Sequence, residues 1–202
     1  MRSKTIVVGA IVSLFAVASL LFIFIAEGEP AQTASESGAL PGMQTGPAPW
    51  LPEIKNLRAR LKAINLPALG AEGEALHIHQ HLDIFVNGKP VTVPAGIGIN
   101  MDARFISQLH THDMSGVIHV ESDQVRDFTL GQFFDVWGVR FTNDCIGGYC
   151  AKGNDKLRVF FDGKPISGDP RSLVLSSHQI IAVVYGAVES TPPIRTTYRF
   201  DD

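Results

Sequence analysis

The chain has 202 residues, of which 45% are hydrophobic and 18% are charged, and its formal net charge at pH 7 is −3. A mildly acidic chain with a pI near 6.1 lacks the basic face of a nucleic-acid binder or a polybasic lipid-surface protein, so we expect neither function. Two cysteines are too few for a disulfide scaffold.

The N-terminal segment predicts a membrane anchor. Residues 5–25, TIVVGAIVSLFAVASLLFIFI, are uncharged and, as a helix, would be roughly 31 Å long, which matches the apolar core of a bilayer. Two basic residues precede the run and two acidic residues follow it, so the positive-inside rule leaves the N-terminus in the cytoplasm. We predict a transmembrane signal anchor over residues 1–26, with a cleaved signal peptide as the alternative. Both interpretations place the rest of the chain outside the cytoplasm, in the periplasm or at the cell surface.

Two segments follow the anchor before the strands begin. Residues 27–50 are rich in proline, glycine and small residues, a composition that predicts a disordered stalk. Residues 51–64, LPEIKNLRARLKAI, place Leu57, Leu61 and Ile64 on one helical face, which predicts an amphipathic helix. The basic residues of this helix either contact anionic lipid headgroups or form a solvated face.

An extracytoplasmic metal-binding domain is predicted over residues 51–202, with its core at 76–186. The segment LDIFVNGKPVTV alternates apolar residues around Asn87 and Gly88, a dipeptide that favours a tight β-hairpin turn. The segment LRVFFDGKPI repeats this pattern later in the chain. The repeat is either a decayed duplication or the same turn chemistry used twice.

The remaining elements complete the fold prediction. Residues 179–186, QIIAVVYG, predict a buried strand. Thr129 and Gln132 have the spacing of a capping box, with Phe128 and Phe133 as its hydrophobic staple, and they predict the start of a helix. We therefore expect a β-rich α+β domain: a small sheet built from hairpins, with one capped helix packed on it.

The two cysteines lie close together in the segment DCIGGYC. Outside the cytoplasm, a local disulfide between Cys145 and Cys150 is the expected state. A redox-active or metal-binding thiolate pair is the alternative, but the spacing differs from that of redox-active pairs.

Six of the seven histidines lie between positions 77 and 119, and the first three alternate in the segment HIHQHLD. Ile78 and Leu82 lie between these polar residues, and apolar residues continue after the segment, which favours a strand over a helix. Because alternate residues of a strand share a face, we expect these polar side chains to lie on one side: His77, His79, His81 and Asp83.

The second group of histidines flanks a predicted turn at residues 113–116, DMSG. A two-residue hairpin loop there would place His110 directly opposite His119, with their Cβ atoms about 5 Å apart. His112 and Glu121 would lie on the same patch. A register slip of one residue would destroy this arrangement.

These patterns predict a transition-metal site for copper or zinc. Neutral imidazole is the commonest protein ligand for such ions, and nearby carboxylates orient the rings or bind the ion themselves. Without a metal, the histidines would form a hydrogen-bonded or pH-sensitive patch. The predicted metal ligands are His77, His79, His81, His110, His112 and His119, and the predicted supporting carboxylates are Asp83, Asp113 and Glu121.

Three segments carry a family resemblance: HIHQHLDIFVNGKPVTVPAGIGI, LHTHDMSGVIHVES and FTLGQFFDVWGVRF. Over residues 76–186 the chain resembles an uncharacterised family of membrane-anchored extracytoplasmic proteins of bacteria and archaea. The resemblance implies an anchored domain outside the cytoplasm, and it brings no catalytic role with it.

Three functions compete at this stage. The first is a membrane-tethered carrier, buffer or sensor of copper or zinc, which the anchor, the stalk and the surplus of histidines favour. The second is a metalloenzyme whose three-histidine site activates water or O₂, with Asp113 or Glu121 as the general base. The third is a pH-responsive interaction module without metal. The sequence identifies no protein partner.

Overall fold

The structure, a computed structural model, describes residues 39–200. The predicted anchor over residues 1–26 and the predicted stalk up to residue 38 lie outside the described residues. Between residues 39 and 200, no helix has both the length and the apolar character needed to cross a membrane.

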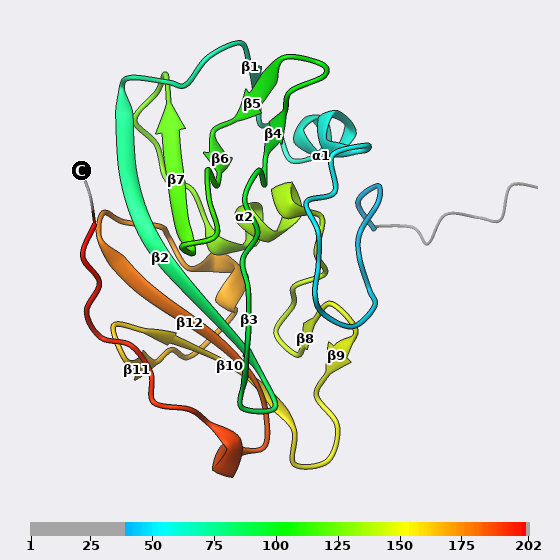
Figure 1. Cartoon of the computed structure of the whole chain (residues 1–202), viewed down its shortest axis with the longest axis vertical. Coiled ribbons are helices and arrows are strands. Elements are labelled where there is room, and N and C mark those ends of the chain that lie inside the picture. Colours follow the sequence, from blue (N-terminus) through cyan, green and yellow to red (C-terminus); the bar gives the residue numbers. More distant parts are fainter. Residues whose placement is uncertain (1–38, 201–202) are drawn as a thin grey trace, which may run out of the picture. The chain divides into compact units, whose positions relative to one another are not determined.

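The main sheet has seven strands, six of them in the order β11-β10-β12-β2-β7-β6, and β3 pairs with β2 beside them (Figure 1). Neighbours are antiparallel except at the centre, where β2 and β12 run parallel with Gln80 opposite Gln179. We predicted a sheet built from hairpins. The sheet does contain hairpins, but its central parallel pair joins segments that are distant in the sequence. The strands are β2 (Leu76–Val86), β3 (Lys89–Val91), β6 (Leu109–His110), β7 (Val117–Ser122), β10 (Lys156–Phe161), β11 (Lys164–Pro165) and β12 (Gln179–Gly186).

Two smaller sheets lie beside the main one. One of them has the order β1-β5-β4, and the other is the pair β8-β9. Cys145 and Cys150 are directly opposite each other in the β8-β9 pair and form a disulfide, which confirms the prediction. The strands are β1 (Ala68–Leu69), β4 (Ile99–Asn100), β5 (Phe105–Ser107), β8 (Cys145–Ile146) and β9 (Tyr149–Cys150).

Both predicted hairpins are confirmed, and their turns explain why. Asn87 and Gly88 have φ angles of 50° and 77°, and Asp162 and Gly163 have φ angles of 46° and 77°. Two successive residues with positive φ match the twist of the flanking strands, and Asn-Gly and Asp-Gly reach this conformation at low cost. The first turn joins β2 to β3, and the second joins β10 to β11.

Among residues 39–200 there are two α-helices, α1 (Leu57–Ala63) and α2 (Leu130–Trp137), and two short 3₁₀ helices, η1 (Pro170–Ser172) and η2 (Val188–Ser190). The capping box of α2 is present as predicted: the Thr129 hydroxyl accepts from the Gln132 N–H, and the Gln132 side chain accepts from the Thr129 N–H. The helix ends at Gly138, whose left-handed conformation, with φ 80°, favours glycine.

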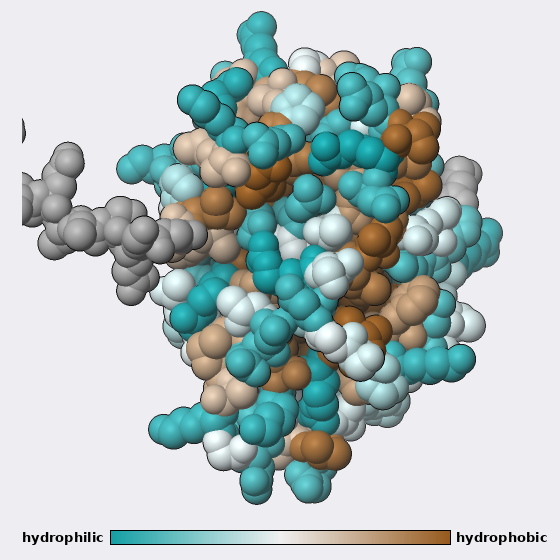
Figure 2. All heavy atoms as spheres, turned by 180° about the vertical axis from the view of Figure 1, so that it is seen from behind, coloured by the Kyte–Doolittle hydropathy of each residue, from teal (hydrophilic) through white to brown (hydrophobic). Residues whose placement is uncertain are grey.

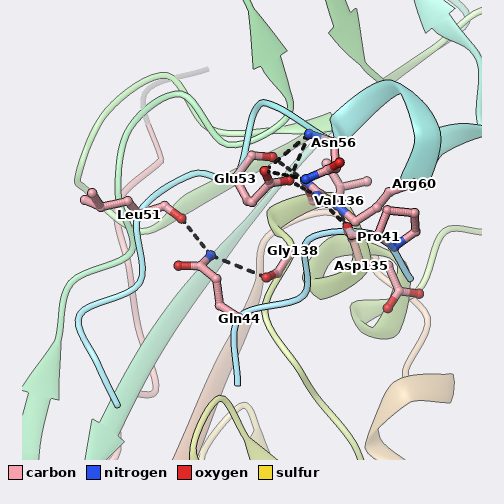
Figure 3. A network of polar contacts seen from close by, with 9 residues as sticks. All are labelled: Pro41, Gln44, Leu51, Glu53, Asn56, Arg60, Asp135, Val136 and Gly138. Atoms are coloured by element: carbon pink, nitrogen blue, oxygen red, sulfur yellow. Dashed lines mark hydrogen bonds and ion pairs between the residues drawn. The ribbon is translucent and has the colours of Figure 1, made fainter. Parts of the chain in front are cut away.

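A buried arginine joins the two helices. Arg60 of α1 is fully buried and donates to the carbonyl oxygens of Asp135 and Val136 at 2.8 and 3.0 Å (Figure 3). These carbonyls belong to the last turn of α2, where they have no partner within the helix. Arg60 also forms an ion pair with Glu53 and donates to the carbonyl of Pro41. A guanidinium at this position satisfies the helix end and offsets its negative dipole.

Residues 39–50 belong to the folded domain, so the predicted stalk is wrong for this part of its length. Trp50 is only 2% exposed and packs edge-on against Trp137, with ring centroids 6.1 Å apart. The backbone N–H of Gln44 donates to the carbonyl of Gly138 at 2.7 Å. The Gln44 side chain donates to the carbonyl of Leu51 (Figure 3). Composition suggested a flexible segment, but one buried tryptophan and a few main-chain hydrogen bonds fix it in place.

The hydrophobic core takes alternate residues of the strands that carry the histidines. Ile118 and Val120 of β7, Leu109 of β6 and Leu82 of β2 are all buried in it, together with aromatic residues of α2. Because successive side chains of a strand point to opposite faces, the histidines of these strands face away from the core. On the back of the molecule, polar and apolar residues are interspersed (Figure 2).

Candidate metal centre

Three neighbouring strands bring the predicted ligands together. Strand β7 lies between β2 and β6, and His119 at its middle is directly opposite His79 on one side and His110 on the other (Figure 1). The pairing of His110 with His119 is the register predicted from the turn. Glu121 of β7 is opposite His77 of β2. One row of three histidines therefore crosses the sheet, with a carboxylate beside it.

Two pairs of histidines flank this central strand. In the open pair, His77 and His79, the two Nε2 atoms are 3.0 Å apart, and the His77 side chain is 56% exposed. In the anchored pair, His110 and His112, the two Nε2 atoms are 3.1 Å apart. Each pair comes from a His-x-His sequence, so the spacing places both rings on the same side of the chain.

The carboxylate of Glu121 lies between the two pairs and is almost fully buried. Its Oε1 is 3.3 Å from Nε2 of His77, 3.4 Å from Nδ1 of His119 and 3.8 Å from Nε2 of His110. Glu121 is therefore itself a candidate ligand, because its Oε1 lies within 3.8 Å of three imidazole nitrogens.

These donors form two overlapping sets that are suited to hold a metal ion. Within each set, one ligand atom per residue lies within 4.8 Å of every other. Both sets contain His119 and Glu121; the first adds the open pair, and the second adds the anchored pair. The structure therefore brings together five of the six predicted histidine ligands and one of the three predicted carboxylates.

His110, which is buried, and His119, which is half-buried, are in the protonation state that a metal ligand needs. Nδ1 of His110 is 3.0 Å from the carbonyl of Ser107, which only accepts hydrogen bonds, so this nitrogen carries the proton and Nε2 keeps its lone pair. Burial, followed by the neighbouring His112, lowers the pKa of His110 to about 3. Burial and the same neighbour lower the pKa of His119 to about 4. Both rings are neutral at pH 7, and neutral imidazole binds metal.

A second carboxylate, which the sequence did not reveal, lies at the edge of the centre. Oε1 of Glu72 is 3.4 Å from Nε2 of His112. Burial raises the pKa of Glu121, and the charge of Glu72 raises it further. Glu72 lies outside the regular strands, where no periodicity or turn signal relates it to the histidines.

The centre is accessible from solvent through a cavity of about 650 Å³. Candidate metal ligands from both sets line this cavity, so an ion or a small ligand has a route to the centre. The lining residues are Glu72, His77, Ile78, His79, His112, His119, Glu121, Ser177 and His178.

The structure places His81 and Asp83 away from the centre, although they share a strand face with His77. His81 is buried, and its ring packs on Tyr198 with centroids 4.1 Å apart. Asp83 forms an ion pair with Arg195 at 3.0 Å. The segment after η2 packs against this part of β2, and neither His81 nor Asp83 belongs to the two ligand sets.

Asp113 also lies outside both ligand sets. Its carboxylate accepts a hydrogen bond from the backbone N–H of Ser115 at 2.8 Å. Hydrogen bonding by the Ser115 side chain, followed by that of its backbone, lowers the pKa of Asp113. Gly116 follows with a φ of 86°. Asp113 therefore shapes the turn between His110 and His119 and belongs to neither ligand set.

Comparisons with protein-family models, with curated proteins and with solved structures found no match to this chain.

Proposed function

We propose that the protein binds Cu²⁺ or Zn²⁺ outside the cytoplasm as a membrane-tethered carrier, buffer or sensor. The observation that carries the proposal is the convergence of five imidazoles on the buried carboxylate of Glu121. Imidazole and carboxylate donors suit both ions, whereas Cu(I) favours sulfur ligands, and neither set contains one.

The cellular location is part of the proposal. The apolar segment at residues 5–25 supports a membrane anchor, and the disulfide between Cys145 and Cys150 fits an oxidising compartment. An anchored domain would meet metal ions that enter from outside the cell and would keep them close to the membrane.

Two features favour a carrier, buffer or sensor over an enzyme. The donors exceed what one ion needs, and the histidines of the open pair line a cavity that reaches solvent. Both features suit an ion that enters and leaves. A metalloenzyme is the second candidate, because the raised pKa of Glu121 suits a general base beside a metal ion.

The test is to measure the metal content of the full-length chain, purified from membranes in mild detergent without an affinity tag. We expect bound copper or zinc, and renewed binding after the metal is removed with a chelator. His110→Ala/His119→Ala is the matched variant and should bind far less. A wild-type chain that is metal-free and binds neither added ion would overturn the proposal.

A carrier and an enzyme differ in how readily they release the bound ion. A carrier or buffer should pass its ion to a coloured chelator within minutes. An enzyme should retain its ion and show turnover with a hydrolysable ester or with O₂. Retention together with turnover would favour the second candidate.

A further inference from the structure

We propose that the centre holds two metal ions side by side, with Glu121 between them as a ligand to both. This inference rests on the proposed function, metal binding, and goes beyond it in the number of ions and in the role of Glu121. Four features of the structure lead to it.

The first feature is the arrangement of the strands. The central strand β7 supplies the two residues that both ligand sets share, His119 and Glu121. The strand on one side, β2, supplies the open pair, and the other side, from β6 onward, supplies the anchored pair. Each half of the centre therefore has its own His-x-His pair, and the halves meet at the shared residues.

The second feature is the surplus of donors. Zn²⁺ in proteins takes four ligands, and Cu²⁺ favours a four-ligand plane with weak axial positions. One ion held by Glu121 and three imidazoles would leave two further imidazoles within the same centre. A second ion would use these two further donors as ligands.

The third feature is the spacing within each pair. With metal–nitrogen bonds of about 2.0–2.1 Å, two imidazole nitrogens on one tetrahedral ion lie roughly 3.3 Å apart. The Nε2 atoms are 3.0 Å apart in the open pair and 3.1 Å apart in the anchored pair. Each pair is already close to the separation at which it would chelate an ion of its own.

The fourth feature is the charge between the pairs. Two dications held close together repel each other, and a shared anionic ligand offsets that repulsion. Oε1 of Glu121 lies 3.3 Å from the open pair, at His77, and 3.8 Å from the anchored pair, at His110. Glu72 brings a second carboxylate to the anchored pair. Nδ1 of His119 is buried without a hydrogen-bond partner among the described residues, and it is available to complete one of the two ions.

The first experiment counts the ions. The full-length chain in detergent is freed of metal, dialysed against excess Zn²⁺ and analysed by elemental mass spectrometry. We expect two Zn²⁺ per chain in the wild type and one in each of the half-site variants, His77→Ala/His79→Ala and His110→Ala/His112→Ala. Circular dichroism of each variant verifies that it is folded.

The second experiment tests the shared ligand. The chain is loaded with Cu²⁺ and examined by electron paramagnetic resonance. Two ions that share a carboxylate have coupled unpaired electrons, so the wild-type signal should be broadened or lost, and each half-site variant should give the signal of an isolated ion. Glu121→Gln should bind only one ion, whereas Glu189→Gln, the same change at an exposed position outside both sets, should bind two.

The outcomes separate the two proposals. One ion in the wild type would overturn the two-ion inference and leave the proposed function intact, and no ion would overturn both. Two ions without magnetic coupling, or two coupled ions in Glu121→Gln, would show that Glu121 does not join them. A half-site variant that loses both ions, while the other half-site variant loses none, would also contradict the arrangement.

Discussion

The two His-x-His pairs have the same spacing but are held differently. In the anchored pair, His110 is 0% exposed, and its Nδ1 is fixed by the carbonyl of Ser107. In the open pair, more than half of the His77 side chain is exposed, and its ring contacts His79 and Glu121 within the centre. The anchored pair extends from the edge strand β6, which β7 and the core hold in place, whereas the open pair lies near the start of the long strand β2.

The His-x-His spacing determines which side chains can act as donors. The surroundings of each pair determine how strongly those donors should bind a metal ion. A hydrogen bond to the far nitrogen of a ligating histidine fixes the ring and raises its basicity. A ring that is already ordered also loses less conformational entropy when it binds. The anchored pair should therefore bind tightly, and the open pair should exchange its ion more readily.

The largest expected effect concerns metal affinity. His110→Ala should weaken the tightest Zn²⁺ binding by more than the roughly 10- to 100-fold that loss of an outer-shell partner costs, because it removes both a ligand and its anchor. His77→Ala should weaken it by only about tenfold. Competition titration against a zinc chelator of known affinity measures both variants. Equal losses would mean that the anchor to Ser107 does not distinguish the pairs.

The next effect concerns the pH dependence of stability in the metal-free protein. In the unfolded chain a histidine takes up a proton below a pKa of about 6.5, whereas folded His110 and His119, with pKa values of about 3 and 4, stay neutral. The unfolded state thus binds more protons as the pH falls from 6.5 towards 4. The free energy of unfolding should drop there by about 1.4 kcal/mol per pH unit for each histidine. The raised pKa of Glu121 acts in the opposite direction and offsets part of this slope.

Urea unfolding between pH 7 and pH 4.5 measures this slope. His110→Asn removes the contribution of one histidine to the pH dependence of the free energy of unfolding. The slope of that free energy against pH should fall by about 1.4 kcal/mol per pH unit, whatever the effect of the substitution on stability at pH 7. Parallel curves for the wild type and the variant would contradict a neutral, buried His110.

The smallest effect on the centre is expected at His81. The variant His81→Asn should keep the metal stoichiometry and affinity of the wild type, because this ring packs on Tyr198 outside both ligand sets. Its cost should be confined to stability, about 1 kcal/mol from the lost ring contact. A variant that bound less metal would return His81 to the centre.

Local chemistry in the sequence predicted much of the fold. The turn residues around Asn87, Asp162 and Gly116 fixed three hairpins, and the capping box at Thr129 fixed the start of α2. The link between His110 and His119 was predictable for the same reason, since the two residues are only nine positions apart and one turn sets their register.

Contacts between distant segments could not be predicted. The parallel pairing of β2 with β12 leaves no local pattern, because it depends on how the whole chain packs. Glu72 and Arg60 acquire their roles from residues far away in the sequence, His112 and the end of α2 respectively. His81 lies outside both ligand sets although the alternation of side chains along β2 was predicted correctly. The contact of its ring with Tyr198 joins distant segments and could not be predicted.

The distances along the chain between paired strands also predict an order of assembly. The β6–β7 hairpin closes over nine residues and carries one complete ligand set: His110, His112, His119 and Glu121. Strand β2 joins β7 across forty residues, at His79 and His119, and β12 joins β2 only after a further long stretch of chain. Contacts between distant residues form more slowly than local ones, because their loops cost more entropy to close. The half of the centre that we expect to bind more tightly is thus the half that should fold first, and an ion captured there would be in place before the open pair arrives.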